Sequence, residues 1–107
     1  MSKEPLLPEE IQILKMMSEL LEEERYYELF NVSSMATQDE IQRGYYAISK
    51  KWHPDRFFRR DVDDYEELIT DMFMGITAAF QTLNNPADRL TYDRTHAIEE
   101  KLEAKSI

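Results

Sequence analysis

The fold is decided by residues 37–56, TQDEIQRGYYAISKKWHPDR. The stretch opens on a capping box, in which Thr37 can accept a hydrogen bond from the backbone N–H of Glu40 while the Glu40 side chain returns one. Its apolar side chains then recur at spacings of four, three and four residues, which places them on one face of a helix: Ile41, Tyr45, Ile48 and Trp52. Pro54 ends this helix, because a proline disfavours the α conformation in the residue before it. The sequence therefore predicts an amphipathic helix that leads directly into the tripeptide His53-Pro54-Asp55.

A second apolar face follows at helical spacing further along the chain. Its members are Tyr65, Ile69, Met72, Ile76, Phe80 and Leu83. The intervening residues 57–62 predict a loop, and Asp63 or Asp64 is suited to cap the second helix. Two matching faces joined by a loop predict an antiparallel helical hairpin. Gly75 within the second helix costs about 1 kcal/mol relative to alanine, and we expect it to let a neighbouring helix approach closely.

Further helices are predicted on both sides of the hairpin. From Pro8 to Glu24 an apolar stripe recurs at helical spacing, and it contains Ile13, Leu14, Met16, Met17, Leu20 and Leu21. A short helix is predicted over residues 26–30. A last helix begins with Asn85 as its N-cap and Pro86 as its first residue, and runs to about residue 105. With only two glycines and no convincing strand, the chain is predicted to be all-α.

The amino-acid composition of the chain excludes several classes of function. The chain has 107 residues, enough for one small domain, and contains no cysteine, which excludes disulfides and thiolate metal or redox sites. It has two histidines, no glycine-rich phosphate loop and no convincing spacing of metal ligands, so we expect no enzyme, no cofactor and no metal site. It also lacks an apolar run suited to a signal peptide or a membrane span, and we expect a cytoplasmic protein with no membrane partner.

Charge is divided along the chain. The formal net charge is −9, yet residues 38–60 hold six basic and three acidic side chains, while residues 61–85 hold six acidic and no basic ones. The basic island consists of Arg43, Lys50, Lys51, Arg56, Arg59 and Arg60. Three interpretations of this island are open. It is a solvated helix face, a docking surface for an acidic partner, or the phosphate-binding surface of a small helical nucleic-acid-binding domain. The overall acidity argues against nucleic acid, because proteins that bind it are normally basic.

The hairpin is flanked by further recognisable elements. Residues 26–32, YYELFNV, precede it, and Arg89 with Tyr92-Asp93 follows it. In order, and together with the helix that ends on His53-Pro54-Asp55, these elements resemble the J domain of DnaJ-type co-chaperones over residues 26–93. The resemblance implies an all-α fold built on an antiparallel hairpin of helices II and III. Short helices I and IV and, in this chain, an extra N-terminal helix complete the expected architecture.

The resemblance also implies a function. In that family the domain docks on a DnaK-type heat-shock ATPase chaperone, stimulates its ATP hydrolysis and contributes no catalytic residue. Asp55 is then expected to accept a charged hydrogen bond from the partner, His53 and Pro54 to shape the turn, and the basic island to meet an acidic surface of the ATPase. Physical chemistry agrees, because an exposed carboxylate on a rigid turn can contact an arginine strongly, and flanking cations raise the on-rate.

Some positions depart from the family pattern. Asn31 stands where the family usually has glycine, and asparagine tolerates the left-handed conformation. Tyr46 and Ala47 stand where basic residues are common, which leaves open a degenerate J domain that recruits a partner without stimulating its ATPase. Phe57 and Phe58, which follow the tripeptide, either pack under the loop or contact a partner.

The chain is expected to have three parts. Residues 1–25 form an N-terminal helical extension, residues 26–93 the J domain and residues 94–107 a C-terminal helical tail. We expect the apolar stripe of the extension to pack back on the J domain, with docking of a partner and dimerisation as the alternatives, and we expect a monomer. No glycine/phenylalanine-rich linker or zinc-binding cysteines follow, so the sequence predicts a stand-alone J protein or one module of a larger chain.

Overall fold

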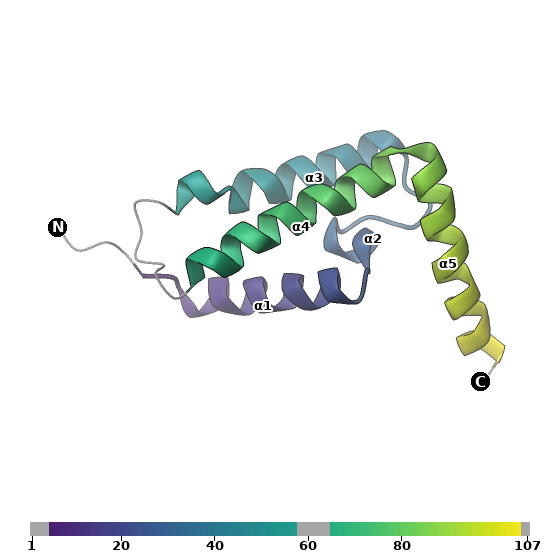
Figure 1. The fold of residues 1–107 in the computed structure, drawn as a ribbon, viewed down its shortest axis with the longest axis horizontal. Helices are drawn as coiled ribbons and strands as arrows, with labels where there is room; N and C mark the ends of the chain where they lie inside the picture. The colour runs from purple at the N-terminus through teal and green to yellow at the C-terminus, as the bar shows by residue number, and fades with distance from the viewer. Residues whose placement is uncertain (1–4, 58–64, 106–107) are drawn as a thin grey trace.

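The secondary structure is all-α, as the sequence predicts. A computed structural model describes residues 5–57 and 65–105, with side chains as far as residue 96. In these residues the helices are α1 (Pro8–Glu22), α2 (Tyr26–Leu29), α3 (Gln38–Trp52), the 3₁₀ turn η1 (Pro54–Arg56), α4 (Glu66–Asn84) and α5 (Pro86–Lys105) (Figure 1). Each α-helix begins and ends within two residues of its expected bounds. Helix IV and the expected tail form one continuous helix, α5. None of the described helices is long and apolar enough to cross a bilayer.

The helices α3 and α4 form the expected antiparallel hairpin (Figure 1). The Tyr45 ring of α3 stacks on the Phe80 ring of α4 with 4.1 Å between centroids, and its hydroxyl lies 3.3 Å from the Thr77 hydroxyl. The capping box is also present: Thr37 Oγ1 accepts from the Glu40 N–H at 3.2 Å, and the Thr37 N–H donates to Glu40 Oε1 at 3.4 Å. The hairpin buries Ile41, Trp52, Ile69, Met72, Ile76, Ala79 and Leu83.

Helix α1 packs on α4 and α2, which confirms that the N-terminal stripe folds back on the other helices. Its buried side chains are Leu14 and Met17. A Cβ atom on Gly75 would lie 3.0 Å from Leu21 Cδ1, so this glycine permits the close approach that the sequence predicts. Met16 was expected in the apolar stripe but is 53% exposed. That expectation is wrong, because the stripe on the helical wheel is wider than the surface that α4 and α2 cover.

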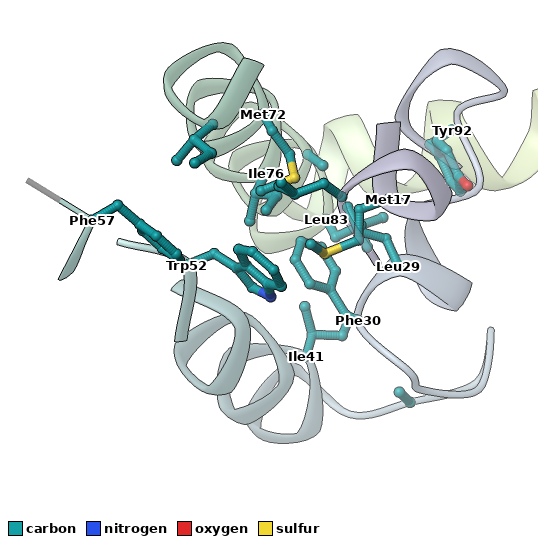
Figure 2. Close-up of a cluster of buried hydrophobic side chains, with 14 of the residues drawn as sticks. Met17, Leu29, Phe30, Ile41, Trp52, Phe57, Met72, Ile76, Leu83 and Tyr92 are labelled. Carbon is teal, nitrogen blue, oxygen red and sulfur yellow. The ribbon is translucent and has the colours of Figure 1, made fainter. Parts of the chain in front are cut away.

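One hydrophobic cluster joins side chains from all five helices. Figure 2 shows Met17 of α1, Phe30 beyond the end of α2 and Ile41 of α3 turned toward one another. Gly44 of α3 lies against this cluster, because a Cβ atom there would be only 2.6 Å from the Phe30 carbonyl oxygen. Asn31, next along the chain, has φ of 56°, which confirms that asparagine adopts the left-handed conformation at this turn.

Two tyrosines fasten α5 to the start of α2. The Tyr92 hydroxyl donates to the Glu24 carbonyl at 2.5 Å and accepts from the Tyr26 N–H at 3.0 Å. The Tyr27 hydroxyl donates to Asp93 Oδ1 at 2.6 Å. Burial, together with the hydrogen bond to Asp93, raises the pKa of Tyr27 to about 12. The turn after α3 lies at the end of the molecule opposite α5 (Figure 1).

Candidate protein-docking site

The tripeptide forms the turn that ends α3. His53 has an extended conformation, with φ of −61° and ψ of 131°, and the 3₁₀ turn η1 begins at Pro54. His53 Nδ1 accepts a hydrogen bond from the Asp55 backbone N–H at 3.1 Å. The same nitrogen lies 3.6 Å from Asp55 Oδ2. The Asp55 side chain is 74% exposed.

The backbone of the turn is held by Arg56. Its N–H donates to the His53 carbonyl at 3.0 Å, and its Nη1 donates to the Lys51 carbonyl at 3.0 Å. The carbonyls of the last helical turn have no partner within the helix, so this guanidinium caps α3 from outside. Arg56 was predicted from sequence as a partner contact, and the structure adds to that expectation a bond that holds the turn.

Aromatic side chains pack against the tripeptide and the residues on either side of it. Phe57 is 4% exposed and stacks on Trp52 with 5.6 Å between ring centroids and 12° between ring planes (Figure 2). Of the two alternatives for Phe57, packing under the loop is the one observed, while Phe58 lies outside the described residues. The His53 ring meets Phe73 of α4 edge-on at 5.0 Å. Phe73 is absent from the predicted site residues, because the contact crosses the hairpin and no local pattern in the sequence marks it.

The predicted cations are only partly gathered around the turn. Lys50 and Lys51 are exposed on the last turn of α3, directly before the tripeptide. Arg43 is exposed about two helical turns earlier and lies 3.8 Å from Asp39, a weak contact between two exposed side chains. The remaining predicted contacts, Arg59 and Arg60, lie outside the described residues.

Tyr46 and Ala47, which stand where the family commonly has basic residues, are also exposed on α3. Tyr46 is 57% exposed and accepts a hydrogen bond from Gln42 Nε2 at 3.0 Å, and Ala47 is exposed one residue later. The exposed side of α3 is therefore cationic at Arg43, Lys50 and Lys51 but neutral at these two positions. This arrangement can bind an acidic protein surface at the end of the hairpin, with the Asp55 carboxylate as a single acceptor beside it.

Comparison with known proteins finds DnaJ chaperone proteins among the matches. The chaperone protein DnaJ of Thermosipho melanesiensis is 39% identical over 69 residues, which cover 64% of this chain and 17% of the relative. That of Thermotoga maritima is 37% identical over 73 residues, or 68% and 18% of the two chains. The chloroplastic chaperone protein dnaJ 20 of Arabidopsis thaliana is 35% identical over 69 residues, or 64% and 33%. No solved structure matches.

These relatives share one region with the chain and are otherwise much longer. The chain spans less than a fifth of the bacterial relatives named above. A match to the DnaJ domain family covers residues 25–93, which include α2, α3, the His53-Pro54-Asp55 turn and α4. The chain therefore belongs to the DnaJ domain family.

Proposed function

We propose that this protein is a J-domain co-chaperone, which docks on a DnaK-type heat-shock ATPase chaperone and stimulates its ATP hydrolysis. One observation carries the proposal: the exposed Asp55 carboxylate stands on a turn in which the Asp55 N–H donates to His53 Nδ1 and Arg56 donates to the Lys51 carbonyl. Membership of the DnaJ domain family supports it. The sequence expectation of a cytoplasmic location is kept as part of the proposal, and imaging of a tagged chain tests it.

The docking step follows from charge and geometry. A carboxylate held on a rigid turn makes a charge-assisted hydrogen bond with an arginine at little entropic cost, because its backbone is ordered before binding. Lys50, Lys51 and Arg43 attract an acidic surface of the partner and raise the association rate.

Stimulation needs no catalytic group from this chain. A protein that binds the hydrolysis-competent conformation of the ATPase more tightly than other conformations shifts the population toward it. Asp55 and its turn supply that preferential contact, and the partner supplies the chemistry.

The test is a single-turnover ATPase assay with a DnaK-type chaperone. We expect wild-type protein to stimulate hydrolysis, and we expect Asp55→Asn and His53→Gln to lose most of the stimulation while keeping their helical circular dichroism. Asp39→Asn is the matched control, because Asp39 is an equally exposed carboxylate at the other end of α3. If Asp55→Asn stimulates as well as wild type, the proposed mechanism is wrong.

A degenerate J domain that docks without stimulating is the second candidate. The neutral, exposed Tyr46 and Ala47 favour it, because they stand on the exposed side of α3 where the family commonly has basic residues. Calorimetric binding of wild-type protein to the chaperone without ATPase stimulation would support this reading. In that case the double variant Tyr46→Lys, Ala47→Arg is expected to gain stimulation.

A further inference from the structure

A groove of about 690 Å³ lies between α1 and α3, with residues of α2 at one end. It exists because α1 packs on α4 and α2, so that α1 and α3 flank α4 and leave the space between them open (Figure 1). In a helical bundle this is the place that a further helix occupies. The groove is absent from the sequence-based expectations, since it depends on where α1 sits.

The floor and the α1 rim of the groove are apolar. Met16 on the α1 rim is 53% exposed, although it is a large hydrophobic side chain. Leu20 of α1 and Ile48 of α3 are half-buried beside it, and the small Ala47 faces the groove from the opposite rim. An exposed methionine beside a hollow of this kind is typical of surfaces that accept an apolar helix face.

The α3 rim is cationic. Arg43 and Lys51 both line the groove, eight residues apart on one helix, with Ala47 between them. That spacing is about 12 Å along the helix axis. Glu40 is on the same rim, but its carboxylate accepts hydrogen bonds from Thr37 in the capping box. The rim therefore offers two cations that are available to carboxylates of a bound segment.

Beyond the α1 rim, where the chain passes from α1 to α2, the surface is acidic. An adjoining hollow shares Met16 and Leu20 with the groove and is lined by Glu19, Glu23, Glu28 and Arg25. Arg25 contacts Glu23 and Glu28, and Glu19 adds a third carboxylate, so this hollow has more negative than positive charge. A bound helix is consequently favoured in one orientation, with its positive N-terminal end at this acidic surface.

We propose that the groove between α1 and α3 binds an amphipathic helix from another protein, with an apolar face and with acidic side chains seven or eight residues apart that pair with Arg43 and Lys51. The helix lays its apolar face against Met16, Leu20 and Ile48. Helices α3 and α4 of a second copy are poor donors, because they already bury their apolar faces against each other. Arg43 and Lys51 also belong to the surface proposed to attract the ATPase, so the helix and the ATPase would compete for them, but binding of the helix is argued from the groove and is measured without the ATPase.

The first test uses a fluorescein-labelled synthetic peptide of four to five helical turns, with leucines on one face and two glutamates eight residues apart along its edge. A matched peptide carries lysines in place of those glutamates. We expect fluorescence anisotropy to give at least a tenfold tighter dissociation constant for the acidic peptide at low salt, with the difference shrinking at high salt. Equal binding of the two peptides, or binding of neither, would overturn the proposal.

Two protein variants locate the binding. Met16→Asp introduces charge at an exposed position of the groove and is expected to weaken binding of the acidic peptide at least tenfold. Met74→Asp is the matched control, because Met74 is 66% exposed on α4 and does not line the groove. If the two variants bind equally, the peptide lies elsewhere and the assignment is wrong. A Met16-dependent dimer in analytical ultracentrifugation would likewise overturn it, because a second copy would then be the occupant.

Discussion

Replacement of Gly44 by alanine tests the closest approach in the fold. Alanine is a better helix former than glycine, so α3 alone gains about 1 kcal/mol from the change. The new Cβ would lie 2.6 Å from the Phe30 carbonyl oxygen, which belongs to the backbone and cannot move by rotating a side chain. Overpacking of this kind costs about 1–3 kcal/mol. We therefore expect Gly44→Ala to lower the free energy of unfolding by up to about 2 kcal/mol, although propensity alone predicts a gain.

Gly75→Ala is the matched control, because it brings the same gain in helix propensity. The new Cβ there would lie 3.0 Å from Leu21 Cδ1, the tip of a flexible and half-buried side chain. A rotamer change relieves this contact for a few tenths of a kcal/mol, so the variant is expected to be as stable as wild type or slightly more stable. The propensity terms cancel between the two variants, so the difference between their stabilities, about 1–3 kcal/mol, measures the difference in steric cost.

Urea denaturation followed by circular dichroism at 222 nm measures this difference. The dependence of the unfolding free energy on urea should be the same for both variants and wild type, because each unfolds the same surface. Gly44→Ala should unfold at a lower urea concentration than Gly75→Ala. If it is equally or more stable, the packing of α3 against the Phe30 carbonyl is looser than described and the reasoning fails.

Three further predictions concern fold stability. Tyr92→Phe removes the hydroxyl that donates to the Glu24 carbonyl, and urea denaturation should show a loss of about 1–2 kcal/mol; no loss would mean that this bond contributes nothing. Thr37→Ala removes the side-chain cap of α3 and should cost about 1 kcal/mol in the same assay, whereas an unchanged midpoint would contradict the capping box. The pKa of Tyr27, raised from 10 to about 12, predicts that the contribution of Tyr27 to stability is constant below pH 10 and is lost as the pH rises from 10 to 12, because only the unfolded state then releases the proton. Urea midpoints across this range should fall less steeply for Tyr27→Phe than for wild type, and parallel slopes would refute the assignment.

The features that the sequence predicted correctly depend on local rules. The capping box at Thr37 and the left-handed turn at Asn31 follow from the chemistry of a few neighbouring residues. The helices and their hairpin follow from the spacing of the apolar residues, because each buried helix face needs a matching apolar face on its partner helix. The close approach at Gly75 was predictable because a glycine within a helix needs a packing reason to offset its cost.

The features that the sequence missed depend on where distant helices meet. Met16 was assigned to the buried stripe, but whether a flank of that stripe is covered depends on the tilt of α1 against α4. The edge-on contact between Phe73 and His53 crosses the hairpin, and the bond from Arg56 to the Lys51 carbonyl needs the chain to reverse direction first. The identity of Arg56 predicts a surface cation, but it does not predict the hydrogen bond that the guanidinium donates to the Lys51 carbonyl.

The packing of α1 has a consequence for how the molecule unfolds. Leu14 of α1 is fully buried, and it shares a cluster with Ile76 of α4, so α1 and the hairpin have one core. The family match begins at residue 25, yet removing everything before it would strip this cover from α4. Amide protons in the middle of α1 should therefore exchange with deuterium as slowly as those of α4, because both are released only when the whole cooperative unit unfolds.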